Sequence, residues 1–142
     1  MKTSRRVVDR VVRIVLAGIL CLLLYVVVND GGHPSPRARF AETQAQINSF
    51  ATALDAFKVD NGFYPSSTNG LEALIQQPPN APNWRGPYLM SETVIPADPW
   101  GSQYHYIVPG LHNTNSFDIL SAGPDRRFGT EDDIVNWVVV TH

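Results

Sequence analysis

The apolar positions of this chain form three kinds of pattern: one continuous run, one stripe of helical period and three short alternations. The run from Ile14 to Val28 holds 15 residues without a charge, and counting from Val11 extends it to 18. Eighteen helical residues span about 27 Å, close to the roughly 30 Å hydrocarbon core of a bilayer. Residues 1–28 also carry five Lys or Arg against Asp9 alone. They are predicted to form a cytoplasmic basic segment and a transmembrane anchor.

A cleaved signal peptide has a similar charge pattern but needs small residues before its cleavage site. Residues 26–29 read Val-Val-Val-Asn and offer none, so we expect the anchor to be uncleaved. Residues 29–39 contain two glycines and two prolines and are expected to be a linker. Residues 40–142 are then one domain outside the cytoplasm.

The stripe of helical period follows the linker and predicts an amphipathic helix from Phe40 to Asp60, which Asn61-Gly62 ends. A short second helix is expected after Asn69, whose spacing to Glu72 fits a capping box. The apolar members of the long stripe are Phe40, Ile47, Phe50, Ala51, Leu54 and Phe57.

The alternations at residues 104–108, 117–121 and 136–140 predict three strands. Turn residues separate the first two strands as in a hairpin. The fold class expected is therefore α+β, with one long helix packed on a small antiparallel sheet.

Composition and charge narrow the functions that this chain can have. It has 142 residues, 44% of them hydrophobic and 17% charged, which suits one folded domain. From Asn29 onward there are six Lys or Arg and twelve Asp or Glu, and this acidic excess argues against a nucleic-acid partner. The single cysteine, Cys21, lies in the apolar run and excludes an intramolecular disulfide.

Enzyme chemistry is not expected. The chain has none of the nucleophile-elbow, zinc-protease, phosphate-loop or dinucleotide motifs. His105 alternates with two tyrosines on a predicted strand, and the four histidines have no ligand-like spacing for zinc.

One short segment could carry chemistry, because it brings four carboxylates within nine residues: Asp125, Glu131, Asp132 and Asp133. Carboxylates on an irregular loop can hold a hard cation such as Ca²⁺, and they can equally form a solvated turn. The segment does not fit an EF-hand loop, because Arg126 and Arg127 stand where that loop has ligands. Their charges would partly neutralise the acids, which favours the solvated turn. A cation stays open because the last three acids cannot all face outward once a strand begins at Ile134.

Five blocks of sequence, in order along residues 41–137, resemble the globular part of the major pseudopilin of the bacterial type II secretion system. The resemblance implies a pilin-like fold, in which a long amino-terminal helix packs on an antiparallel sheet. The blocks are Leu54–Pro65, Gly70–Leu74, Asn83–Leu89, Pro96–Gly101, and Ser121–Asp125 with Asp132–Trp137.

The resemblance also implies a function and a cofactor. A pseudopilin is a structural subunit that joins other pseudopilins or inner-membrane subunits, with its head in the periplasm, and it can form homo-oligomers. Members of the family bind Ca²⁺ in the loop that corresponds to the acidic segment. Carried over, Asp125 and Asp133 match side-chain ligands, Glu131 or Asp132 supplies a third carboxylate, and Ala122 supplies a backbone carbonyl.

The amino-terminal part departs from the family. Pseudopilins have a Gly followed by Phe-Thr-Leu and a glutamate as the apolar helix begins, whereas residues 10–15 here read Arg-Val-Val-Arg-Ile-Val. The only early glycine, Gly18, is deep in the apolar run. A second hypothesis follows: a membrane-tethered binding module that does not polymerise but has a Ca²⁺-stabilised head.

Overall fold

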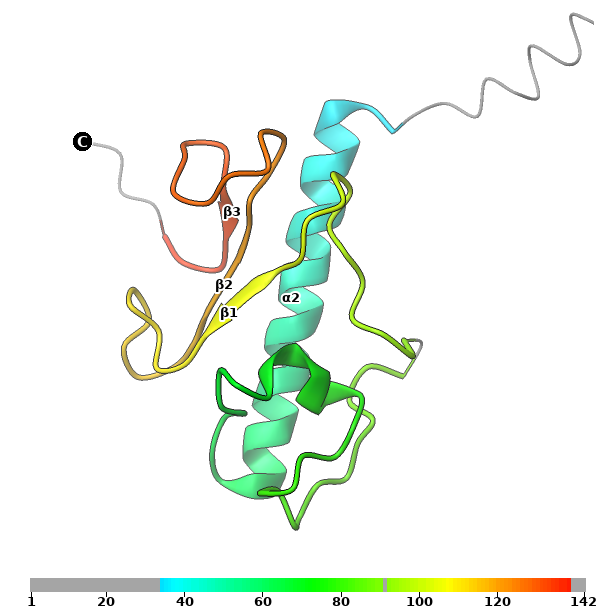
Figure 1. Ribbon diagram of the computed structural model, residues 1–142, viewed down its shortest axis with the longest axis vertical. Coiled ribbons are helices and arrows are strands. Elements are labelled where there is room, and N and C mark those ends of the chain that lie inside the picture. The colour runs from blue at the N-terminus through cyan, green and yellow to red at the C-terminus, as the bar shows by residue number, and fades with distance from the viewer. Residues whose placement is uncertain (1–33, 91, 139–142) are drawn as a thin grey trace, which may run out of the picture. The chain divides into compact units, whose positions relative to one another are not determined.

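The computed structural model describes residues 34–90 and 92–138, so the predicted anchor and most of the predicted linker lie outside the described part. One long helix packs against a three-stranded antiparallel sheet, which confirms the predicted α+β, pilin-like class (Figure 1). None of the helices within the described residues has the length and apolar character needed to cross a bilayer. The elements are α2 (Pro36–Asn61), the 3-10 helix η1 (Gly70–Leu74), β1 (His105–Ile107), β2 (Asp118–Ser121) and β3 (Ile134–Val135).

Helix α2 buries four members of the predicted stripe, whereas Phe40 is 38% exposed and Ala51 is half-buried. It begins at Pro36, where proline suits the first turn of a helix, so residues 36–39 are helical and not part of a linker. Gly62 follows its end with a left-handed φ of 83°. The buried face consists of Thr43, Ile47, Phe50, Ala53, Leu54 and Phe57.

The predicted capping box at Asn69 is wrong. Asn69 has helical backbone angles, whereas a residue that caps a helix is usually extended, and its side chain makes no capping bond. Its Nδ2 instead donates to Asn80 Oδ1 at 3.2 Å. The short helix that follows is a single 3-10 segment.

The sheet has the order β1-β2-β3, and both pairs are antiparallel. The third strand was predicted at residues 136–140, but the pairing lies at Ile134–Val135. Asn136 explains the difference, because it bonds Ile119 partly through its side chain. The N–H of Asn136 donates to the carbonyl of Ile119 at 3.2 Å, and Asn136 Oδ1 accepts the N–H of Ile119 at 2.9 Å. Its Nδ2 also donates to the carbonyl of Phe117 at 3.1 Å.

Strand β1 lies at one edge of the sheet. The N–H and the C=O of Ile119 on β2 both bond to Asn136, on the side away from β1. Tyr106 of β1 lies opposite Ile119. Because hydrogen bonds alternate along an antiparallel pair, the N–H and C=O of Tyr106 point away from the sheet. Two residues later, Val108 N–H on the same side donates to Ser67 Oγ at 3.1 Å.

The core lies between the buried face of α2 and the sheet. Phe50 of α2 meets Tyr104 edge to face, with ring centroids 5.0 Å apart. Near the end of α2, the ring of Phe57 lies 5.7 Å from that of Tyr88. Burial of these aromatic side chains stabilises the domain. Most of the loop between β2 and β3 lies at the surface.

Candidate metal centre

The acidic loop, residues 123–133, connects β2 to β3. It starts after the fully buried Ala122 and turns at Gly123, whose φ is 62°. A Cβ at Gly123 would overlap the carbonyl oxygen of Asp132, so only glycine lets the two ends of the loop approach this closely. The sequence therefore brings Ala122 and the last acids of the loop to one place.

Three of the predicted carboxylates already accept hydrogen bonds from the loop itself. Asp125 Oδ1 accepts the N–H of Arg127 at 2.8 Å, and Asp133 Oδ2 accepts the N–H of Gly129 at 2.7 Å. Asp132 Oδ2 accepts the N–H of Asp125 at 3.1 Å. These bonds fold the loop around its own acids.

The second oxygen of Asp133 is different. Its Oδ1 is buried and has no hydrogen-bond partner among the described residues. A buried carboxylate oxygen without a donor is costly, because it has lost its water and gained nothing in return. A cation is one group that would satisfy it.

Asp132 carries its negative charge at neutral pH. The hydrogen bond from the Thr130 hydroxyl lowers the pKa of Asp132, and with the bond from the N–H of Asp125 it outweighs the opposing effect of burial. An ionised carboxylate with fixed geometry is the type of oxygen ligand that Ca²⁺ takes.

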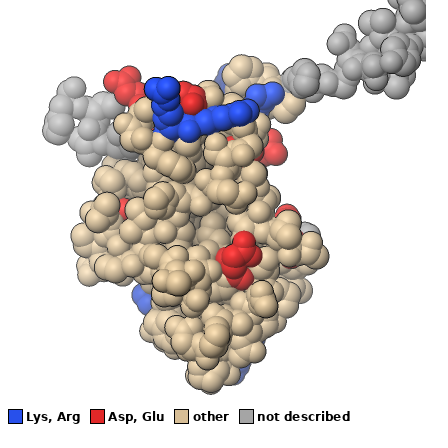
Figure 2. All heavy atoms as spheres, in the orientation of Figure 1, with Lys and Arg blue, Asp and Glu red and all other residues tan. Residues whose placement is uncertain are grey.

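The four predicted carboxylates share this loop, but together with Ala122 they do not form a complete coordination shell. Within residues 34–90 and 92–138, no three acidic, histidine or cysteine side chains are grouped closely enough to hold an ion. Glu131 is exposed and lines an open groove of about 580 Å³ between the start of α2 and β3. Figure 2 shows that charged side chains are sparse on most of this face and gather at the end near the acidic loop and the first turns of α2.

The sequence reasoning missed two polar residues at the base of this loop. Ser121 is fully buried, and its hydroxyl donates to Asp98 Oδ2 at 2.6 Å. The same hydroxyl oxygen accepts the N–H of Gly123 at 3.2 Å. The Asp-Pro-Trp-Gly turn was a visible signal, because aspartate at the start of such a turn bonds backbone amides, but its link to Ser121 spans 23 residues.

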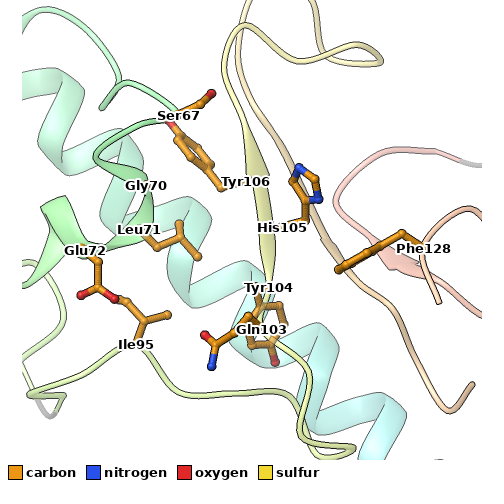
Figure 3. A pocket seen from close by; sticks show the side chains of 10 residues that line it. All are labelled: Ser67, Gly70, Leu71, Glu72, Ile95, Gln103, Tyr104, His105, Tyr106 and Phe128. Atoms are coloured by element: carbon orange, nitrogen blue, oxygen red, sulfur yellow. The ribbon is translucent and has the colours of Figure 1, made fainter. Parts of the chain in front are cut away.

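A separate hollow of about 390 Å³ lies beside β1, and His105 is one of the residues that line it. Figure 3 shows His105 extending from β1 toward Phe128 of the acidic loop, while Glu72 lies across the hollow on η1. The rings of His105 and Phe128 meet edge to face at 5.3 Å. His105 is thus placed against an aromatic ring, and Glu72 is not oriented to act with it.

Comparison with known proteins supplies an independent result. Residues 33–137 match the protein family described as type II secretion system (T2SS), protein G. The type II secretion system core protein G of Escherichia coli (strain K12) is 41% identical over 127 residues, which cover 87% of this chain and 83% of that protein. The protein of the same name from Vibrio cholerae is 35% identical over 142 residues, covering 96% and 92%.

A solved structure shares the fold as well as the sequence. It is the crystal structure of the major pseudopilin from the type 2 secretion system of enterohaemorrhagic Escherichia coli. The match has a TM-score of 0.61 at 35% identity and covers 71% of this chain and 88% of that one.

Proposed function

This chain belongs to the type II secretion system protein G family and is a structural pseudopilin subunit of that system, and we propose that Ca²⁺ in the acidic loop stabilises its head. The head is taken here as residues 36–138, which form the compact part of the described chain. A structural role in secretion needs a head that stays folded, and no catalytic role is proposed.

The observation that supports the calcium proposal is the buried, unpartnered Oδ1 of Asp133. Asp125 and Asp133 would hold the ion by their carboxylates, Glu131 or Asp132 would add a third, and Ala122 would offer its carbonyl. All are hard oxygen donors, which is the ligand chemistry of Ca²⁺. When bound, the ion offsets the mutual repulsion of the clustered acids.

The position of Asp133 explains how such an ion would act on the fold. Asp133 directly precedes β3, which is only two residues long and joins the sheet through Ser121 and Leu120. A cation shared between Asp133 and the start of the loop would therefore close the loop at both ends and hold β3 in the sheet.

The place of the subunit in the cell is also a proposal. The apolar run of residues 14–28 would anchor the chain in the bacterial inner membrane, with the basic amino terminus in the cytoplasm and the head in the periplasm. The partners would be other pseudopilin or inner-membrane subunits of the secretion system, including further copies of this chain.

Thermal unfolding of the full-length chain in mild detergent, followed by tryptophan fluorescence, tests the calcium proposal. A ligand that binds only the folded state at 100 times its Kd stabilises that state by about 2.7 kcal/mol. For a domain of this size this corresponds to a rise in Tm of roughly 10 °C. We expect such a rise on replacing EGTA with millimolar Ca²⁺.

Two variants make the test specific. Asp133→Asn should abolish the calcium-dependent rise, since it removes the charge of the central ligand. Glu42→Gln, which neutralises an exposed acid on α2, should leave the rise unchanged. Identical unfolding of the unmodified chain in EGTA and in Ca²⁺ would overturn the proposal.

A second candidate function is a tethered module that binds calcium but does not polymerise. The feature that favours it is the sequence of residues 10–28, which contains no acid in the apolar run and no Phe-Thr-Leu. The two functions differ in whether the chain enters a polymer, which is a property of the whole molecule and is tested at that scale below.

A further inference from the structure

Two buried polar side chains lie at the base of the acidic loop, outside the candidate ligand set. Asp98 is 4% exposed and Ser121 is fully buried. A buried carboxylate is retained only where several donors offset the loss of its water. The hydrogen-bond donors to Asp98 come from its own turn and from Ser121.

One oxygen of Asp98 is held by its own turn. Oδ1 accepts the N–H of Trp100 at 3.1 Å and the N–H of Ser102 at 2.8 Å. The Asp98 backbone N–H also donates to the Ser102 carbonyl at 2.9 Å. The carboxylate therefore has a fixed position before it reaches the loop.

The other oxygen fixes the direction of the Ser121 hydroxyl. A serine hydroxyl has one proton, and here the proton goes to Asp98 Oδ2. The lone pairs of Ser121 Oγ are then free to accept, and one of them takes the N–H of Gly123. The chain of bonds runs from Gly123 through Ser121 to Asp98.

The last bond of this chain also orients a candidate ligand. The N–H of Gly123 and the C=O of Ala122 belong to the same peptide group, which is planar. In a trans peptide the two bonds point in opposite directions, so holding the N–H toward Ser121 turns the Ala122 carbonyl away from it. The buried position of Ala122 allows little other movement.

We propose that Asp98 and Ser121 are positioning residues that set the Ala122 carbonyl in the orientation needed to bind the calcium ion. The inference rests on the proposed calcium function and adds two residues to it that touch no ion. Its physical basis is preorganisation: a ligand already held in place loses less freedom on binding, so the ion binds more tightly.

A purely structural role for the same bonds makes a different prediction. If Asp98 and Ser121 only joined the turn to β2, their loss would lower stability equally with and without calcium. If they position the carbonyl, their loss weakens calcium binding to the chain while it is still folded. Calcium affinity is therefore the deciding measurement.

Isothermal titration calorimetry of the full-length chain with Ca²⁺ measures the calcium affinity. Ser121→Ala removes both bonds and should weaken the affinity about tenfold, the lower end of the effect of residues that support metal ligands. Asp98→Asn retains the volume and an acceptor for the turn but loses the acceptor for the hydroxyl proton, so a smaller loss is expected. It also serves as the test if Ser121→Ala does not fold.

Asp118→Asn is the matched control, because Asp118 is the other buried aspartate of the described residues and lies at the opposite end of β2 from Ser121. It should lower stability without changing calcium affinity. Amide hydrogen exchange without calcium gives a second readout: Ser121→Ala should speed exchange at Gly123 and leave Ile119 unchanged.

The possible results separate the inference from its premise. If the unmodified chain binds no Ca²⁺, both the calcium function and the inference fail. If it binds and Ser121→Ala binds equally well, only the inference fails. Weaker binding in Ser121→Ala together with unchanged binding in Asp118→Asn would support both.

Discussion

At the scale of single residues, Asp118 shows how one buried carboxylate organises a loop. It is 1% exposed and accepts the N–H of His112 at 2.8 Å and the N–H of Asn113 at 3.0 Å. Nδ1 of the His112 ring lies 3.2 Å from the same carboxylate. The His112 ring stacks on the ring of Trp137, with centroids 4.0 Å apart. Through His112, Asp118 therefore also supports the segment after β3.

The ionisation of Asp118 predicts how stability depends on pH. Burial alone would raise the pKa of Asp118, but the bonds from His112 and Asn113 outweigh it and lower the pKa. A pKa lowered by folding adds stability above the ordinary value of about 3.9, and this stability is lost as the pH falls through the folded value. Unfolding by urea should therefore become easier below about pH 4.

Asp118→Asn isolates this contribution. It should cost about 1–3 kcal/mol at pH 7, because donors on the loop lose their charged acceptor. It should also make the decline in stability below about pH 4 shallower. Urea midpoints of the two chains at pH 7 and pH 3 measure both effects, and parallel pH profiles would contradict the assignment.

The residues that could be predicted from the sequence are those whose partners lie nearby in it. Asp125, Glu131, Asp132 and Asp133 were identified as a group because they share one short segment. Ser121 was not, since its role depends on a partner 23 residues away. Only the folded chain brings the turn that contains Asp98 to the base of the loop.

At the scale of elements, the same difference between local and distant partners decides which predictions held. Helix α2 has a long stripe of one period, so it was predicted with a start four residues too late and an end one residue too early. The third strand was displaced from residues 136–140 to Ile134–Val135, since the side chain of Asn136 performs pairing that a backbone usually makes. A side chain that replaces backbone pairing in this way leaves no periodic pattern of apolar residues in the sequence.

The packing of α2 on the sheet predicts a large effect at Phe50. This side chain is fully buried and meets the ring of Tyr104. Phe50→Ala should destabilise the head by about 3–5 kcal/mol, since it removes buried surface and leaves a cavity.

Val59→Ala is the control on the same helix, because Val59 is 85% exposed. Its effect should stay within about 0.5 kcal/mol. Denaturant unfolding monitored by tryptophan fluorescence measures both variants. Equal midpoints for the two would show that this face of α2 does not carry the core.

At the scale of the whole molecule, the chain joins a family head to an unusual amino-terminal sequence. Residues 33–137 match the family, while residues 10–15 lack the pattern with which pseudopilins begin. The sequence of the head identifies the family. The amino-terminal sequence bears on whether the chain can join a polymer. That part lies outside the described residues.

Polymerisation can be measured directly. When the full-length chain is expressed with a complete type II secretion machine, we expect it to be sheared from the cells as a sedimenting polymer. The same chain in cells without the machine should remain in the membrane fraction. Recovery in the membrane fraction alone in both cases would favour the tethered module over the pseudopilin subunit.

The placement of β1 at the edge of the sheet bears on how such subunits can crowd together. An unpaired strand edge is a template on which another chain can add a strand and aggregate. Here β1 is three residues long, only Tyr106 within it turns its backbone outward, and Ser67 already bonds the next outward position at Val108. Added strands are usually five or six residues long. The β1 edge is thus too short for lateral strand addition, which disfavours a continuous β-sheet between heads through this strand.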